Sequence, residues 1–383
     1  MKYLLFHGTF DMFHNGHLAI LKKAMSLDHY DQIIITPSNT KFFLDDYNLD
    51  FVAKKKQLLS IKEDRVHMIK ASIKDLAYPI QICDYELNQV SKAYSIDTIN
   101  YYYSTYGNNN DYYFIIGSDQ VANLKDWKDI ESIVCKVTFL CFLRNKDDKE
   151  TIASKLDQLK CNYSIIDFDV DISSTVIKQV HQPDHLVDEV FDFINDNGLY
   201  AIYLLEKYLI NESDLDDQSK NINRIKHCYR VGEYAHFIML HYDQSKARLA
   251  YSAGVYHDIL KNCSEPKTLA YFKQHQKELK INDFVSWRVL HANNGAHLLQ
   301  TKYHFKNQEL INAIARHTRP FDYNNANEIS LLDKVLYCAD KLEPARMEGI
   351  DLYNIDHYRN LVLENIDQAF IEIYEQLQNK EVK

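Results

Sequence analysis

The chain has 383 residues, which is long enough for two domains of about 100–200 residues each. Its 46% hydrophobic and 26% charged residues are ordinary for a globular protein, and the formal charge of −10 argues against nucleic acid or an anionic membrane as a general partner. The seven cysteines form no CxxC pair, and no apolar run approaches the ~20 residues of a membrane span. We therefore expect a cytoplasmic protein that acts on small molecules.

Strands and helices alternate in the first half of the chain. Short apolar runs predict strands at residues 3–6, 32–36, 79–87, 112–117, 136–143 and 163–168. Helical spacing falls between several of them, at residues 16–26, 51–75 and 95–106. This order is typical of an α/β, Rossmann-like parallel sheet, in which ligands bind beyond the carboxyl ends of the strands.

The second half of the chain lacks strand signals. From about residue 204 the apolar residues follow helical spacing, most clearly at residues 224–240, 247–260, 310–318 and 330–343. An all-α bundle is therefore expected there. Gly198 in "DNGLYA" can close a helix, so we predict two domains, residues 1–203 and 204–383.

A first candidate site follows the first predicted strand, in "GTFDMFHNGHL" at residues 8–18. Gly8 and Gly16 let the backbone approach a ligand closely, and the start of the next helix is a natural phosphate site. His14 and His17 lie three residues apart, so both rings can face one side and donate hydrogen bonds to phosphate oxygens. Two solvated loop histidines are the plain alternative.

A second motif, "ISSTVIK" at residues 172–178, has the composition of a phosphate cradle. Ser173, Ser174 and Thr175 suit a helix N-cap, and Lys178 adds a cation one turn later. Together they predict contacts to the β- and γ-phosphates of a nucleotide. An ordinary capped helix is the alternative.

Both motifs resemble those of the nucleotidyltransferase superfamily that carries an H-x-G-H signature. With "YSIDT" (94–98), "IIGSDQ" (115–120) and "LKDW" (124–127), residues 1–203 are similar to nicotinate mononucleotide adenylyltransferases. The resemblance implies AMP transfer from ATP, with Mg²⁺, to nicotinate or nicotinamide mononucleotide in NAD biosynthesis. Lys178 stands where the family usually has arginine. Lysine keeps the charge but lacks the bidentate fork of arginine, which predicts weaker ATP binding. His7 replaces a common glycine, and Met12 a common proline.

The resemblance also implies residue roles. Catalytic roles fall to His14, His17 and Lys178. Trp127 is the candidate for stacking on the pyridine ring, although a core tryptophan is the alternative. The implied ATP- and substrate-binding residues are Gly8, Thr9, Phe10, Gly16, Ser95, Thr98, Gly117, Asp119, Trp127, Ser173, Ser174 and Thr175.

A second candidate site is spread over the helical half. The dipeptide His257-Asp258 is a weak signal alone, but it indicates a site together with the histidines and the aspartate on neighbouring predicted helices. Imidazoles and carboxylates on inner helix faces suit a transition-metal site. One ion is expected at His227, His257, Asp258 and Asp340. A second is expected at His291 and His317, with Asp258 bridging; His297 competes with His291, which we favour.

This set resembles the HD superfamily. The segments "HCYRV", "HDILK", "GAHLL", "ARHT" and "SLLDKVLYCADKLEPAR" are similar to a bacterial HD hydrolase that splits diadenosine tetraphosphate into two ADP. The resemblance covers residues 220–350 and implies a dinuclear centre of iron, with manganese, zinc or nickel also accepted. Lys261 and Arg346 are the candidate phosphate contacts, Lys261 in a catalytic role. Ala292 replaces the family's usual glycine.

A bifunctional enzyme is the leading hypothesis, and there are two alternatives. The helical half can instead be a nucleotide-sensing regulatory module without turnover, although a complete set of six ligands argues against it. An aminoacyl-tRNA synthetase-like protein also carries H-x-G-H. The acidic charge, the short first domain and the "ISST" motif disfavour that reading.

Overall fold

The chain forms two compact units in a computed structural model. The structure describes residues 1–39, 62–89, 91–144, 148–168, 177–178, 183–212, 218–279, 286–321, 329–345 and 354–381. Unit 1 comprises Met1–Ile177 and Gln182–Phe191, and unit 2 comprises Lys178–His181 and Asp192–Lys383. The functional boundary at residue 203 stays a prediction. Within the described ranges, no helix is long and apolar enough to cross a membrane.

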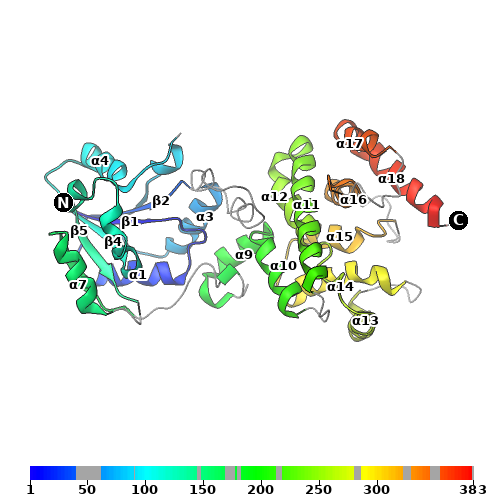
Figure 1. Cartoon of the computed structure of the whole chain (residues 1–383), viewed down its shortest axis with the longest axis horizontal. Helices are drawn as coiled ribbons and strands as arrows, with labels where there is room; N and C mark the ends of the chain where they lie inside the picture. Colours follow the sequence, from blue (N-terminus) through cyan, green and yellow to red (C-terminus); the bar gives the residue numbers. More distant parts are fainter. Residues whose placement is uncertain are drawn as a thin grey trace. The chain divides into compact units, whose positions relative to one another are not determined.

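Unit 1 is built on a six-stranded parallel sheet in the order β3-β2-β1-β4-β5-β6 (Figure 1). Its strands are β1 (Lys2–Gly8), β2 (Gln32–Pro37), β3 (Ile80–Ile82), β4 (Asp111–Gly117), β5 (Thr138–Phe142) and β6 (Asn162–Ile166). The central strands are apolar on both faces, as expected of a covered parallel sheet. Leu5 faces one core cluster with Phe114, and Leu4 faces the other with Ile115.

Helices cover both faces of this sheet. The helices of unit 1 are α1 (Asn15–Leu27), α3 (Lys62–Ile73), α4 (Ser95–Tyr106), α5 (Ser118–Val121), α6 (Ile130–Val134), α7 (Lys149–Gln158) and part of α9 (Asp188–Asp196). Leu21 of α1 packs into the cluster of Leu4, whereas Ile99 of α4 packs into the cluster of Leu5. The predicted α/β, Rossmann-like fold is confirmed.

One predicted strand is shorter than expected. The run at 79–87 forms β3 only over Ile80–Ile82, and a 3-10 turn follows at Glu86–Asn88. β3 pairs only with Ile33–Ile35 of β2. β2 ends at Pro37, which has no amide hydrogen to extend a ladder, so the chain is free to turn.

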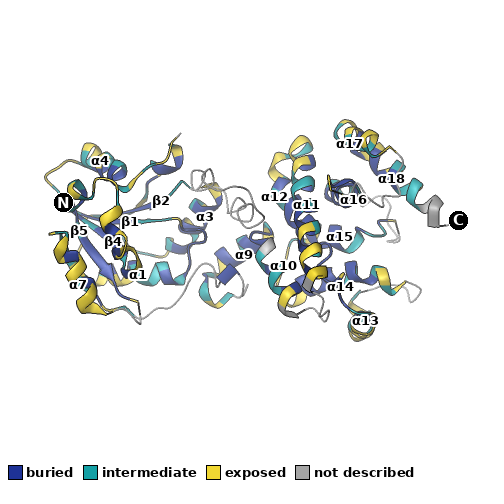
Figure 2. Ribbon diagram, in the orientation of Figure 1, coloured by how far each residue is buried: buried dark blue, intermediate teal, exposed yellow. Residues whose placement is uncertain are grey.

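Unit 2 is helical, and its described residues include no strand. Its helices are α10 (Ala201–Lys207), α11 (Gln218–Tyr242), α12 (Ala247–Tyr256), α13 (Glu265–Leu279), α14 (Leu290–Thr301), α15 (Gln308–Arg316), α16 (Leu331–Leu342), α17 (Ile355–Glu364) and α18 (Ile366–Glu381). α12 and α16 are buried along most of their length (Figure 2). The predicted helix at 247–260 ends early, so His257 and Asp258 lie in the turn after α12.

Candidate functional sites

The two histidines of the first predicted site lie together at the start of α1. Their rings stack with centroids 3.8 Å apart, and the backbone amide of His14 donates to Nδ1 of His17 at 3.3 Å. Burial, with help from His14 and Arg144, holds the pKa of His17 well below its usual range. His17 is therefore neutral. Because its Nδ1 accepts, Nε2 carries the proton and can donate to a phosphate oxygen.

A cavity of about 380 Å³, the histidine cavity, opens beside these rings. It brings together seven of the catalytic and nucleotide-binding residues predicted from the sequence: Gly8, Phe10, His14, Gly16, His17, Gly117 and Asp119. A Cβ on Gly8 would lie 2.8 Å from the ring of Phe10, so a larger residue here would have to displace that ring. Arg144 also lines the cavity and pairs with Asp119 at 3.4 Å, a contact that the sequence did not reveal.

A second, larger cavity of about 660 Å³, the tryptophan cavity, contains Thr9, Ser95 and Trp127. His7, Gly8 and Gln120 line both cavities, so the two adjoin at the carboxyl ends of β1 and β4. This is where a parallel sheet places its ligands. The ammonium groups of Lys92 and Lys128 also border the tryptophan cavity, and the sequence analysis missed both.

Other predicted residues lie elsewhere. Thr98 is buried, and its hydroxyl donates to Glu86 Oε1 at 2.7 Å. Glu86 lines the tryptophan cavity, whereas Thr98 does not. Lys178 is buried with its ammonium 4.7 Å from the centroid of the Tyr200 ring. The motif residues Ser173, Ser174 and Thr175, as well as Arg346, lie outside the described residues.

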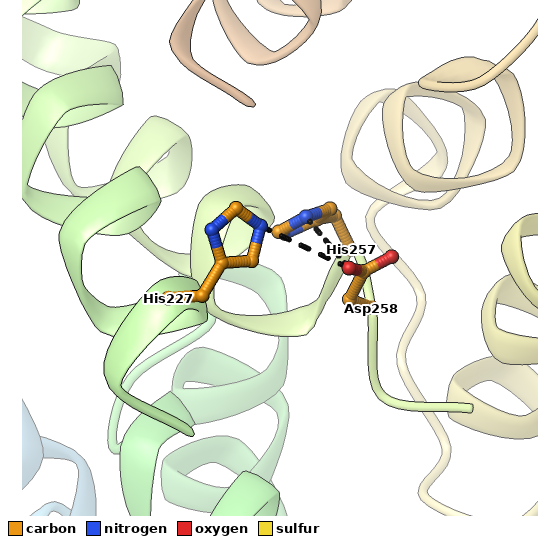
Figure 3. Close-up of side chains that lie close together, drawn as sticks. All are labelled: His227, His257 and Asp258. Carbon is orange, nitrogen blue, oxygen red and sulfur yellow. Dashed lines mark ion pairs between the residues drawn. The ribbon is translucent and has the colours of Figure 1, made fainter. Parts of the chain in front are cut away.

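Unit 2 gathers all six predicted metal ligands. His227 comes from α11, His257 and Asp258 follow α12, His291 lies on α14, His317 follows α15, and Asp340 lies on α16. Figure 3 shows the imidazoles of His227 and His257 close to the Asp258 carboxylate.

Asp258 lies between two groups of imidazoles. Its Oδ2 lies 3.4 Å from His257 Nε2 and 3.9 Å from His227 Nε2. Its Oδ1 lies 3.0 Å from His291 Nε2 and 3.5 Å from His317 Nε2. Asp340 completes the first group, with Oδ1 3.2 Å from His227 Nε2. One carboxylate with a different oxygen toward each group is the arrangement of a bridging ligand.

Backbone carbonyls orient three of these imidazoles. The Nδ1 atoms of His257, His291 and His317 lie 2.6, 2.8 and 2.7 Å from the carbonyl oxygens three residues earlier. Nδ1 therefore carries the proton, and Nε2 is left free as a metal donor. At His227 the carboxylate of Glu343 takes this place, 3.5 Å from Nδ1. Nothing in the sequence pattern had singled out Glu343.

The residues present fit divalent metal ions. His257 Nε2 is fully buried, yet it has no hydrogen-bond partner among the described residues. Burial lowers the pKa of His257, but Asp258 and Asp340 more than offset this and raise it to about 9. The imidazoles likewise hold the pKa of Asp258 well below its usual range despite burial. Such a negative, nitrogen-rich site attracts cations.

Cations also surround the opening of this site, a cavity of about 520 Å³ that we term the HD cavity. Lys220, Arg224, Lys261 and Lys341 line it together with the metal ligands. Arg224 donates to Asp258 Oδ2, and burial lowers the pKa of Lys261. Cationic side chains in the same cavity as a buried carboxylate pair suit a phosphorylated ligand.

Comparisons with known proteins find relatives of both halves of the chain. The cytidylyltransferase-like family model matches residues 5–180, and the HD domain model matches residues 224–345. A probable nicotinate-nucleotide adenylyltransferase of Clostridium tetani is 32% identical over 52% of this chain and 98% of its own length. The chain belongs to the nicotinate-nucleotide adenylyltransferase family. The family and the two-part fold predicted from the motifs are confirmed.

Some relatives match this adenylyltransferase-family chain over nearly its whole length, and others match one half of it. A probable nicotinate-nucleotide adenylyltransferase/Ap4A hydrolase of Mycoplasma genitalium is 29% identical over 99% of this chain and 98% of its own. The solved structure of a predicted HD superfamily hydrolase involved in NAD metabolism, from Clostridium acetobutylicum, is 25% identical over 46% of this chain and 85% of its own, with a TM-score of 0.37.

Proposed function

We propose that the chain is a bifunctional enzyme with one activity in each half. Residues 1–203 would transfer AMP from ATP to nicotinate mononucleotide, releasing pyrophosphate. Residues 204–383 would hydrolyse a dinucleoside polyphosphate, such as diadenosine tetraphosphate, to ADP. The support for the first activity is strongest, because the family match and the site geometry point to the same chemistry.

The observation that carries the first activity is the shared wall of the histidine and tryptophan cavities. ATP in the histidine cavity would meet the neutral His17 and its neighbour His14 at the start of α1, where N–H groups favour phosphate. A mononucleotide in the tryptophan cavity would then direct its 5′-phosphate at the α-phosphorus. Positioning and charge stabilisation suffice, so no protein nucleophile is needed. Mg²⁺ bound to ATP would neutralise the phosphates.

Product identification tests this activity. The full chain is supplied with ATP, Mg²⁺ and either nicotinate or nicotinamide mononucleotide, and the dinucleotide and pyrophosphate are measured. His17→Ala should slow the reaction by roughly 10²- to 10³-fold, the usual effect of removing one transition-state donor. Exposed His29 provides the matched control, His29→Ala, which should keep the wild-type rate. Equal rates in both variants would contradict the role of His17.

The observation that carries the second activity is the division of the Asp258 oxygens between two imidazole groups. His227, His257, Asp258 and Asp340 would hold one divalent metal, and His291, His317 and Asp258 a second. Iron is favoured, with manganese, zinc or nickel as alternatives. Such a pair supplies a hydroxide and steadies a phosphoryl oxygen. Arg224 and Lys261 would bind the phosphates and keep the substrate oriented.

A nucleotide-sensing module without turnover is the second candidate for this half, and product analysis separates the two. Symmetrical hydrolysis of diadenosine tetraphosphate by the metal-loaded full chain yields ADP alone. Asp258→Ala should remove this activity, whereas Asp356→Ala, at a side chain 84% exposed, should keep it. Binding of the tetraphosphate without any ADP in the wild type would favour the sensing module.

A further inference from the structure

A third group of metal-ligand residues lies outside both proposed active sites. His275 and Glu278 are one turn apart on α13, and His297 faces them from α14. Glu278 Oε2 lies 2.7 Å from His297 Nε2 and 3.5 Å from His275 Nδ1. The two imidazole rings are 4.6 Å apart between centroids. Two helices thus direct two nitrogens and one carboxylate at the same point.

This group is distinct from the HD cavity. His297 follows His291 by six residues on α14, which turns it about 240° around the helix and moves it about 9 Å along the axis. His291 therefore contacts Asp258, whereas His297 contacts Glu278. None of the three residues of the group lines the HD cavity.

A neighbouring hydroxyl fixes the orientation of the buried member. Tyr271 Oη lies 2.9 Å from His297 Nδ1. With a metal bound, Nδ1 would donate to this hydroxyl and leave Nε2 unprotonated for the ion, in place of its present contact with Glu278, as in metal-bound histidines whose other nitrogen is held by an outer partner. His297 is only 8% exposed, so its ring is prepositioned by burial as well.

We propose that His275, Glu278 and His297 form a separate site for a single Zn²⁺ ion. Two imidazoles, one carboxylate and a water match a common four-coordinate zinc set. Bonds of about 2.0–2.1 Å at tetrahedral angles place neighbouring donor atoms about 3.3 Å apart. The His275–Glu278 separation already has this value within 0.2 Å. Glu278 needs only a small rotation away from His297, and its side chain is 61% exposed and free to make it.

The ion would join α13 to α14. Because α14 also carries His291, zinc at this site would stabilise the helix that supplies the second HD position. The proposal does not depend on hydrolysis by unit 2, since it concerns a different donor set.

Zinc stoichiometry of the full chain tests the proposal. Metal is stripped by chelation, and Zn²⁺ is titrated back against a chromophoric chelator. His275→Ala should bind one equivalent fewer than the wild type, while exposed His241→Ala should match the wild type. Glu278→Gln, at an exposed side chain, should weaken the same equivalent at least tenfold without a folding risk. When Co²⁺ is supplied in place of Zn²⁺, the visible absorption from cobalt at this site should be present in the wild type and missing in His275→Ala.

Two results would overturn the zinc site. If His275→Ala and Glu278→Gln both bind the wild-type number of equivalents with unchanged affinity, the group is only a His–Glu ion pair. If both variants lose more than one equivalent, the group supports the HD ligands and is not a site of its own.

Discussion

His7 is a buried imidazole, and its burial makes the stability of unit 1 depend on pH. Its Nε2 lies 2.8 Å from the Tyr102 hydroxyl, and burial lowers its pKa from 6.5 to about 3. Between these values the unfolded chain binds a proton that the folded chain excludes. Stability from this residue is therefore complete above pH 6.5 and is lost as pH falls toward 3, by about 1.4 kcal/mol per pH unit. His7→Gln should flatten this part of the profile.

Denaturant unfolding of the full chain at pH 7 and pH 5 measures the effect. The loss between the two values should be smaller by about 2 kcal/mol in His7→Gln than in the wild type. His29→Gln, at an exposed histidine of the same unit, should show the wild-type loss. Parallel profiles for the wild type and His7→Gln would mean that His7 takes up a proton without cost in the folded chain.

Substitution of Trp127 tests where the pyridine ring binds. The indole is half-buried against Phe114, with ring centroids 6.2 Å apart, and it lines the tryptophan cavity. Trp127→Ala should raise KM for nicotinate mononucleotide about tenfold, since a lost aromatic stack costs about 1.4 kcal/mol, and leave KM for ATP nearly unchanged. Trp287→Ala removes the other tryptophan, in unit 2, and should change neither value. An equal rise for both substrates would refute the stacking role.

Residue types and spacing predicted which side chains converge in unit 2, but not the side chains that orient them. The H…HD…D order places His227, His257 and Asp340 because ligands on inner helix faces must converge. Glu343 has no such signal, since its contact with His227 Nδ1 spans 116 residues and depends on how α11 and α16 pack. The same limit applies to Thr98. The motif "YSIDT" predicts that the start of α4 lines the site, but only the packing shows that the Thr98 side chain contacts Glu86.

At the scale of elements, the close approach of α11 and α12 positions the first group of metal ligands. A Cβ on Gly254 would lie 2.6 Å from the backbone of Gly232, so the two helices touch without side chains between them. α11 carries His227, and α12 leads directly to His257. Gly254→Ala should therefore separate these ligands. We expect a loss of about 1–3 kcal/mol in stability, typical of overpacking, and weaker metal binding.

Gly295→Ala on α14 is the matched comparison for Gly254→Ala. There a Cβ would meet only the side chain of Ile259, at 3.1 Å, and that side chain can yield. Unfolding free energies and metal stoichiometry of the two variants should rank Gly254→Ala as the more damaging. The reverse order would show that the α11–α12 contact does not set the ligand spacing.

Element types were predictable from periodicity, while element ends were less so. The strand–helix alternation of unit 1 and the helical spacing of unit 2 follow from which positions are apolar. The early end of α12 was not predictable, because "YHDILK" keeps helical spacing past Tyr256 although the chain turns there. That turn is what brings Asp258 between the two groups of histidines.

At the scale of the whole molecule, the two units differ in the metals that their proposed reactions need. In the proposed reaction, unit 1 would bind phosphate with amides and imidazoles and would need only the Mg²⁺ that arrives with ATP. Unit 2 offers buried nitrogen donors that would hold a divalent transition metal. Because each unit is compact and buries its own apolar residues, loss of metal from one need not unfold the other.

Chelation should therefore separate the two activities within one chain. After removal of transition metals and resupply of Mg²⁺ alone, adenylyl transfer should stay near the wild-type rate, while ADP release from diadenosine tetraphosphate should fall at least a hundredfold. Fe²⁺ or Mn²⁺ should restore the hydrolysis, but not in Asp258→Ala, because its bridging carboxylate is gone. His17→Ala should show the reverse pattern, with hydrolysis kept and adenylyl transfer lost. Loss of both activities on chelation, with unchanged circular dichroism, would mean that adenylyl transfer also depends on the metals of unit 2.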